Sequence, residues 1–332
     1  MAARHRGRHD RRGIAADADV LLAAARRPLV IGIGGGGDVV GALATAEACR
    51  RAHGADPVVG GVAWERLVID PEPGPRGVAE IVGEVGRPAP AVLLAGPDTR
   101  VASSGVRFGE AHMARFLGQE TVLVDVLGGP AAVARSVSAT ARFLGTDLLV
   151  FVDVGGDVLG HGDEPGLASP LCDAVMLAAA ARLAAAPDGP PVLAAVFAPG
   201  CDGELTLEEI ADRVAEVAAA GGLAGAHGLT PAVAERLEQA VLEVPTEASA
   251  QALRCFRGER GVAAIRRGER EVPLSPVGAT TTYLDPRVTV ATAARLAAAI
   301  FDEESLEEAN EVLHSLGVRT ELDLERERSM SA

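Results

Sequence analysis

The sequence predicts an α/β protein in which helices cover both faces of a mainly parallel β-sheet. Segments with strand character alternate along the chain with segments of helical periodicity, as in repeated βα units. The strand segments are continuous runs of Val, Leu, Ile and Ala, which are typical of strands buried on both faces. Four consecutive glycines follow the first of these runs. Together these observations predict a Rossmann-like, three-layer αβα core with a helical C-terminal elaboration.

The elements of the core are expected between residues 28 and 200. Strands are predicted at residues 29–33, 57–62, 91–95, 121–126, 148–154 and 192–198. Helices are predicted between them, at residues 39–52, 106–117, 131–144 and 171–186. Because ligands of such sheets bind beyond the carboxyl ends of the strands, we expect the site on that edge.

The pattern changes after residue 200. Helices are predicted at residues 206–220, 231–243 and 247–257, followed by short strands at 261–266 and 279–284 and by two terminal helices. Residues 201–332 are therefore expected to form a helical C-terminal subdomain with short strands, or part of the same fold. Residues 1–27 are expected to be a flexible tail followed by a first helix, because residues 1–12 lack the apolar segment of a targeting signal.

The composition excludes several classes of protein. All 31 basic residues are arginine, so no lysine can bind phosphate in a P-loop, form a Schiff base or anchor pyridoxal phosphate. The net charge of −15 argues against nucleic acid as a partner. No apolar run reaches about 18 residues, so no membrane association is expected. Four scattered cysteines without a C-x-x-C motif argue against a zinc knuckle or a disulfide scaffold and predict a cytoplasmic location. A homo-oligomer remains open.

The first predicted strand runs into the four glycines Gly34, Gly35, Gly36 and Gly37. A turn without Cβ atoms lets a ligand approach the backbone and the first amides of the next helix. The spacing also satisfies G-x-G-x-x-G, beginning at Gly32, which is a dinucleotide signal. Asp38 follows directly, and its carboxylate would repel a pyrophosphate unless a cation intervenes. We expect Asp38 to be a helix cap, a hydroxyl or metal ligand, or a catalytic base.

An acidic motif ends the fifth predicted strand, where Asp153 and Asp157 are separated by Val154, Gly155 and Gly156. The two glycines allow both carboxylates to face the same space. Such a pair can coordinate Mg²⁺ or another divalent ion, bind sugar hydroxyls, or divide acid and base work. The alternative is an Asx-turn with a helix cap. His161 is the candidate for proton transfer, unless it is an ordinary exposed loop histidine.

Similar turns follow the other predicted strands. Residues 96–98, which end the third strand, are expected on the same edge, and Asp202 and Glu204 follow the sixth strand. Glu204 is alternatively a charge at a helix start. The exit of the second strand carries Glu65, Arg66 and Arg76. In a chain without lysine these arginines are the expected anion ligands, the alternative being surface arginine.

The motifs occur in an order that resembles an archaeal and actinobacterial family known only as domain of unknown function 1152. The resemblance extends from about residue 29 to residue 286, and it implies a shared site without a known reaction. It also adds Glu247 to the expected ligand-binding residues. The motifs that carry it are Gly61-Val62-Ala63-Trp64-Glu65-Arg66, Asp70-Pro71, Pro73-Gly74-Pro75-Arg76, Val152-Asp153-Val154-Gly155-Gly156-Asp157, Ser169-Pro170-Leu171, Gly200-Cys201-Asp202-Gly203-Glu204-Leu205 and Pro245-Thr246-Glu247-Ala248-Ser249.

The function predicted from these residues is that of an enzyme acting on a nucleotide or sugar phosphate by hydrolysis or group transfer. The glycine loop and an arginine would bind the phosphate. Asp153, Asp157 and Asp202 would bind a divalent ion or sugar hydroxyls, with tentative metal ligands in Asp153 and Asp157, and one acid would act as general base. The alternatives are an NAD(P)-dependent oxidoreductase and a non-catalytic nucleotide-binding protein.

Overall fold

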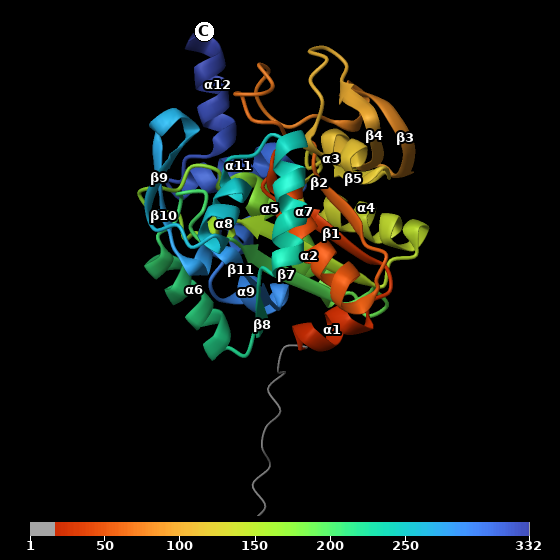
Figure 1. Ribbon diagram of the computed structural model, residues 1–332. Helices are drawn as coiled ribbons and strands as arrows, with labels where there is room; N and C mark the ends of the chain where they lie inside the picture. Colours follow the sequence, from red (N-terminus) through yellow and green to blue (C-terminus); the bar gives the residue numbers. More distant parts are fainter. Residues whose placement is uncertain (1–16, 332) are drawn as a thin grey trace, which may run out of the picture.

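The computed structural model describes residues 17–331, and a nine-stranded sheet forms the centre of this part of the chain (Figure 1). The order of the strands is β3-β4-β5-β2-β1-β6-β7-β11-β8. All of them except β4 and β11 run in the same direction. The strands are β1 (Pro28–Gly32), β2 (Val58–Val62), β3 (Ile81–Ala89), β4 (Val92–Val101), β5 (Thr121–Val124), β6 (Leu148–Val154), β7 (Val192–Phe197), β8 (Leu223–Gly228) and β11 (Thr280–Leu284).

The five central strands are parallel, in the order β5-β2-β1-β6-β7. Ile31 of β1 is paired with Gly60 of β2 on one side and with Phe151 of β6 on the other. The chain moves outward from β1 to β2 and β5, and in the opposite direction from β6 to β7. The strand order therefore reverses between β1 and β6, which is where ligands bind in open parallel sheets.

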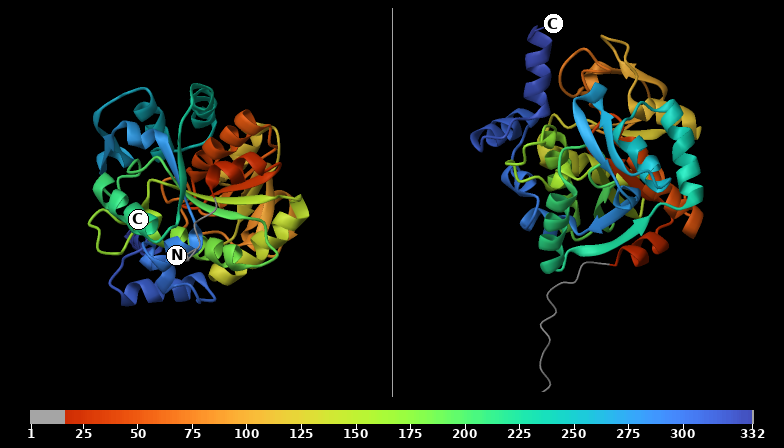
Figure 2. Two further views of the ribbon diagram at one scale, coloured as in Figure 1. Left: turned by 90° about the horizontal axis from the view of Figure 1, so that it is seen from below. Right: turned by 60° about the vertical axis from the view of Figure 1, so that its left-hand side comes forward.

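Helices pack on both faces of the sheet. Alternate residues of β1 enter different hydrophobic clusters, because Leu29 and Ile31 face one side while Val30 faces the other. On the side of Val30 lie α1 (Ala18–Ala24), α2 (Asp38–His53), α7 (Pro231–Glu243) and α8 (Ala248–Phe256). On the other side lie α4 (Gly129–Leu144), α5 (Pro170–Ala185), α9 (Pro286–Ala291), α10 (Arg295–Ala299) and α11 (Leu306–Ser315), as Figure 2 shows.

The chain after residue 200 continues the same sheet, since β11 pairs antiparallel with β7 and β8 pairs with β11. This part also contains α6 (Leu207–Ala219), the antiparallel pair β9 (Gly261–Ile265) and β10 (Arg270–Leu274), and the terminal helix α12 (Glu321–Ser331). The remaining helix, α3 (Gly109–Leu117), precedes β5. No helix within residues 17–331 is long and apolar enough to cross a membrane.

The third predicted strand is wrong in its direction and its end. The segment 91–95 does not end at residues 96–98, which instead continue β4 as far as Val101. Because Val92 is paired with Val124 and Ala95 with Thr121, β4 runs antiparallel to β5 and carries residues 96–98 to the opposite edge of the sheet. A buried apolar run specifies a strand but leaves its direction open.

Three strands and two helices were not predicted: β3, β8, β10, α9 and α10. The first two of these strands alternate exposed and partly buried residues and contain glycines, so they lack the continuous apolar run used to find the others. A first helix is present as α1, whereas the expected tail at residues 1–12 lies outside the described residues.

Candidate functional site

The glycine run connects β1 to α2 and is fixed against the residue that follows β2. Gly35 and Gly36 have φ values of 76° and 51°, in the left-handed region that favours glycine. A Cβ on Gly35 would lie 2.6 Å from the carbonyl oxygen of Trp64, and the Gly36 N–H donates to that oxygen at 3.0 Å. The backbone conformation of the loop therefore requires glycine at Gly35.

The Asp38 carboxylate turns back onto this loop. Asp38 is the first residue of α2, and its Oδ2 accepts the Gly34 N–H at 2.9 Å. The N-cap position belongs to Gly37, so Asp38 is not the helix cap. Burial raises the pKa of Asp38 to about 7, although the Gly34 N–H and Arg66 act in the opposite direction. Asp38 thus uses an amide that a bound phosphate would otherwise accept.

Asp38 lies beside two carboxylates from other elements, Asp153 at the end of β6 and Asp173 in the first turn of α5. One oxygen from each residue lies within 4.8 Å of the others, and we call these three residues the aspartate triad. Asp153 and Asp173 are each only 1% exposed. Both oxygens of Asp153 and Oδ1 of Asp173 have no hydrogen-bond partner among the described residues. Polar atoms this deeply buried are normally paired, so the triad is short of a ligand or of protons.

Burial is the largest cause of the raised pKa values in the triad. It raises the pKa of Asp153 well above its usual range, and the neighbouring Asp38 and Asp202 raise it further. Burial also raises the pKa of Asp173, with Asp153 and Asp38 as the next causes. The three carboxyl groups therefore do not all remain ionised unless a cation joins them.

A second acid group, Asp157, Asp202 and Glu204, lies where β6 and β7 end. The turn after β6 is fastened to the turn after β7, because the Gly155 N–H donates to the Phe197 carbonyl at 3.0 Å and the Gly200 N–H to the Gly155 carbonyl at 2.6 Å. Gly155 has a φ of 122°, and a Cβ there would lie 2.2 Å from Asp202 Cγ. The glycine thus allows the two acidic turns to touch.

Glu204 and Asp202 are two residues apart but differ in their hydrogen-bond partners and in the direction of their pKa shifts. Glu204 accepts the N–H groups of Ala168 and Ser169 at 2.7 and 2.9 Å, and Arg270 at 2.6 Å. Despite burial, Arg270 keeps the pKa of Glu204 below its usual value, so Glu204 is an ionised and fully bonded anchor. Within residues 17–331 neither oxygen of Asp202 makes a hydrogen bond of normal geometry. Burial raises its pKa to about 7, although the Glu204 N–H lowers it.

Ser169 also donates its hydroxyl to Glu204. It occupies the N-cap position of α5 but makes no side-chain hydrogen bond to the first turn of that helix.

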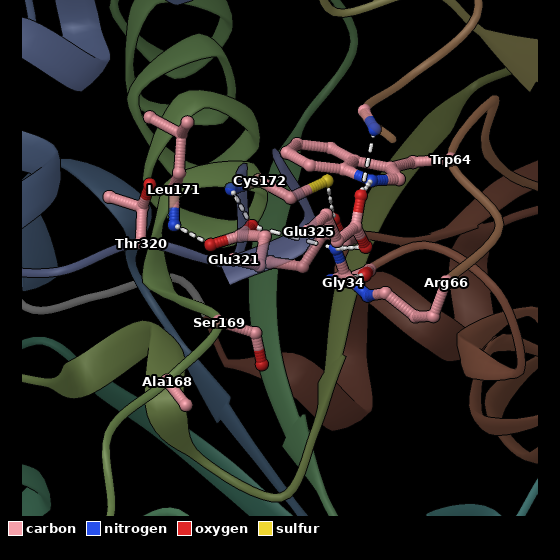
Figure 3. A network of polar contacts seen from close by, with 12 residues as sticks. Gly34, Trp64, Arg66, Ala168, Ser169, Leu171, Cys172, Thr320, Glu321 and Glu325 are labelled. Carbon is pink, nitrogen blue, oxygen red and sulfur yellow. Dashed lines mark hydrogen bonds and ion pairs between the residues drawn. The ribbon is translucent and has the colours of Figure 1, made fainter. Parts of the chain in front are cut away.

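Arg66 connects the glycine loop to the C-terminal helix (Figure 3). Its Nη2 donates to the Gly34 carbonyl at 2.5 Å, and its guanidinium lies 4.9 Å above the Trp64 ring. Nη1 lies 3.7 Å from Glu321 Oε1 and 3.9 Å from Glu325 Oε1. One cation therefore serves two buried carboxylates of α12.

The same two glutamates bind backbone and indole donors. Glu321 accepts the N–H groups of Leu171 and Cys172, at 3.0 and 2.8 Å, and so caps α5 from another part of the chain. Glu325 accepts the Trp64 indole N–H at 3.0 Å. Burial raises the pKa of Glu321, and Arg66 is the first of the groups that lower it.

Other residues of the predicted site lie around this centre with partners of their own. Glu65 accepts the Gly109 N–H at 2.6 Å, and burial raises its pKa to about 7. The guanidinium of Arg76 is buried, and its Nε donates to Asp70 Oδ2 at 2.9 Å. The fold therefore already occupies a donor of this arginine.

His161 and Glu247 are not joined to the triad by any contact within residues 17–331. The charges that act most strongly on His161 are Arg213 and Arg295, and burial lowers its pKa. Glu247 is exposed and accepts the Arg266 N–H at 2.5 Å.

Three residues of the site were not among the predicted ones: Asp173, Glu321 and Glu325. Asp173 had a usable signal, because it is the only acidic residue of α5, a helix whose only other charged residue is Arg182. Glu321 and Glu325 carry no such sequence signal, because α12 is charged along most of its length and nothing distinguishes them from its other charged residues.

The comparison with protein families agrees with the order of the sequence motifs. A family model described as protein of unknown function DUF1152 matches residues 29–329. The chain belongs to this family. No curated protein and no solved structure matches the chain. The match includes nearly all of α12, so Glu321 and Glu325 lie in the part of the chain that the DUF1152 model covers.

The buried acids predict an unusual dependence of stability on pH in metal-free buffer. The folded pKa values of Asp38, Glu65 and Asp202 are about 7, whereas their ordinary values are 3.8 to 4.5. A carboxyl group with a raised folded pKa binds more protons in the folded state, so stability falls as pH rises toward the folded pKa and levels off above it. The lowered pKa values of His112 and His161 act in the opposite direction, chiefly below pH 6.5.

We therefore expect urea denaturation in EDTA to give a free energy of unfolding at pH 8 that is lower than at pH 6.5 by at least about 2 kcal/mol, at about 1.4 kcal/mol per pKa unit. Asp153, Asp157 and Asp173, whose pKa values are raised further, add to the same slope. Asp38→Asn should flatten this slope, and Asp163→Asn, which changes an exposed carboxylate, should not. A free energy that rises over this interval would contradict the burial of these groups as ionisable acids.

Proposed function

We propose that the protein is a cytoplasmic enzyme that acts on a phosphorylated small molecule, a nucleotide or a sugar phosphate, by hydrolysis or group transfer. The observation that carries the proposal is the meeting of the aspartate triad, the glycine loop and Arg66 where the strand order reverses. Ligands of open parallel sheets bind at such a position. We further propose that the five central strands and their helices are a Rossmann-like, three-layer core.

The phosphate would be bound by Arg66 together with a cation or hydroxyl bridge from the triad. The Arg66 side chain is 23% exposed, but its Nη1 is buried and its Nη2 donates to the Gly34 carbonyl. A phosphate would therefore share this guanidinium with its internal partners. Asp38 already accepts the Gly34 N–H, and a phosphate at this loop would meet a carboxylate. This arrangement disfavours a bare pyrophosphate, and it supports hydrolysis or transfer over nicotinamide redox chemistry.

Asp38 has the properties of the general base. It is partly exposed, whereas Asp153 and Asp173 are buried. Its pKa of about 7 lies near the operating pH, where a general base is most efficient. We assign to Asp38 the removal of a proton from the attacking water or hydroxyl, and to the deeper aspartates the positioning of the substrate.

Thermal unfolding of the full chain with nucleotides and sugar phosphates, each with Mg²⁺ and with EDTA, tests this proposal. A true ligand at a hundredfold excess over its Kd should add about 2.7 kcal/mol of stability. Asp38→Asn should lose at least a hundredfold in turnover, whereas the exposed Asp188→Asn should keep both binding and turnover. If no phosphorylated compound stabilises the protein, the proposal fails, and stabilisation without turnover in the wild type indicates a non-catalytic nucleotide-binding protein.

A further inference from the structure

The aspartate triad gathers the oxygen donors of a metal site, and it contains a residue, Asp173, that sequence patterns did not single out. The three carboxylates come from the start of α2, the end of β6 and the first turn of α5, and their nearest oxygens lie within 4.8 Å of one another. A Cβ on Gly34 would lie 2.6 Å from Asp38 Oδ2 and 3.2 Å from Asp173 Oδ2, so both oxygens border the surface of the glycine loop.

The unpartnered oxygens of Asp153 are a separate observation that points to a ligand. This side chain is 1% exposed, and neither of its oxygens has a hydrogen-bond partner in the described part of the chain. Glu204, which is equally buried, is bonded to three backbone or side-chain donors and an arginine. The Val158 N–H and the Asp157 carboxyl group are the groups that lower the pKa of Asp153, but neither makes a hydrogen bond of normal geometry with it. The contrast shows that the fold supplies strong donors to Glu204 and only weak ones to Asp153.

The charges nearby do not neutralise the triad. Arg66 is the arginine that acts on Asp38 and Asp173, and it also faces Glu321 and Glu325. One guanidinium is thus shared among several carboxyl groups. Additional positive charge has to come from protons or from a bound cation.

The donor set identifies the chemical class of the cation. All three groups are carboxylate oxygens, which suit hard divalent ions such as Mg²⁺, Mn²⁺ and Ca²⁺. The group contains no sulfur, and the Cys172 thiol, next to Asp173 in the chain, donates to the Ile33 carbonyl at 3.0 Å. A soft-metal site is therefore disfavoured.

We infer that Asp38, Asp153 and Asp173 bind one hard divalent cation, with water or substrate completing its coordination. The inference rests on the proposed function in one respect, because it places the cation in the same site. The cation is expected to bind whether or not a substrate is present. Asp157, Asp202 and Glu204 do not form an equivalent site, because Glu204 is already saturated by Ser169 and Arg270. The partly exposed Gly34 and Asp38 give the ion its way in.

Electron paramagnetic resonance of Mn²⁺ measures this binding directly, because bound Mn²⁺ loses its sharp solution signal. Full-length protein stripped with EDTA is titrated with Mn²⁺, and Mg²⁺ is then added as competitor. We expect one Mn²⁺ per chain, displaced by Mg²⁺. Asp173→Asn and Asp153→Asn should each weaken binding at least tenfold. The matched control is Asp188→Asn, which changes an exposed carboxylate outside every acidic group of the described residues and should bind as the wild type.

Asparagine is chosen because it has the shape of aspartate and removes a buried charge. The variants should therefore fold, which circular dichroism checks. No Mn²⁺ binding up to millimolar concentration, or unchanged binding in Asp173→Asn, overturns the inference and indicates a cluster held by shared protons. Loss of binding in Asp157→Asn but not in Asp173→Asn overturns it too. Mn²⁺ binding without stabilisation by any phosphorylated compound contradicts only the proposed function.

Discussion

Replacing Arg66 by alanine should lower the free energy of unfolding by about 3–5 kcal/mol at pH 7.5, the range for removing one partner of a buried ion pair. The side chains of Glu321 and Glu325 are only 4% and 7% exposed, and both would lose their cation. The variant also loses the contact with the Trp64 ring. Since these contacts attach α12, helix α12 should detach before the rest of the chain unfolds.

Urea denaturation followed by tryptophan fluorescence measures the effect, because Trp64 is the only tryptophan of the chain and lies in this group. The matched control is Arg257→Ala, whose pair with Glu238 is on the surface and should contribute less than about 1 kcal/mol. Adding Glu321→Gln and Glu325→Gln to Arg66→Ala should recover part of the loss, since neutral amides need no cation. A loss no larger than that of the control would mean that Arg66 does not stabilise α12.

Replacing Gly155 by alanine should destabilise the protein by about 3–5 kcal/mol, from backbone strain and overpacking together. The φ of Gly155 is 122°, which L residues rarely adopt. The added Cβ would also lie 2.2 Å from Asp202 Cγ. Either the turn after β6 or the turn after β7 has to move, and the second acid group should separate.

The control for this variant is Gly54→Ala, at the end of α2. Gly54 also has a positive φ, 70°, but no atom lies within 4 Å of its Cβ position. It should therefore cost only about 1–2 kcal/mol, the penalty of the left-handed conformation alone. Thermal and urea unfolding measure the loss of stability in both variants. Equal losses in Gly155→Ala and Gly54→Ala would show that the turns after β6 and β7 are not in contact.

The central strands could be predicted from sequence because they are buried on both faces. The segment predicted at 148–154 is β6 without change, and 29–33 differs from β1 by one residue at each end. Their continuous apolar runs reflect burial between two layers of side chains. The β3–β4 hairpin could not be predicted in the same way. β3 alternates exposed and buried residues, so it has no continuous apolar run, and β4 runs antiparallel to its neighbours, which an apolar run does not indicate.

The candidate site was predicted as far as it follows strand ends. Asp38, Asp153 and Asp202 are expected at the carboxyl edge because each lies at or after the end of a strand of a parallel sheet, and the structure places them there. Asp173 comes from the start of a helix and Glu321 from the last helix of the chain. Their positions depend on how α5 and α12 pack in three dimensions, which no local pattern encodes.

A crystal structure of the wild type soaked in Mn²⁺, with an anomalous difference map, tests the central claim most directly. The claim is that carboxylates from α2, β6 and α5 surround a ligand position beside the glycine loop. We predict an anomalous peak bounded by Asp38, Asp153 and Asp173, at about 2.2 Å from their oxygens, as for hard divalent ions. A map without a peak there, with the three carboxyl groups hydrogen-bonded to one another in a dry cluster, would contradict the account.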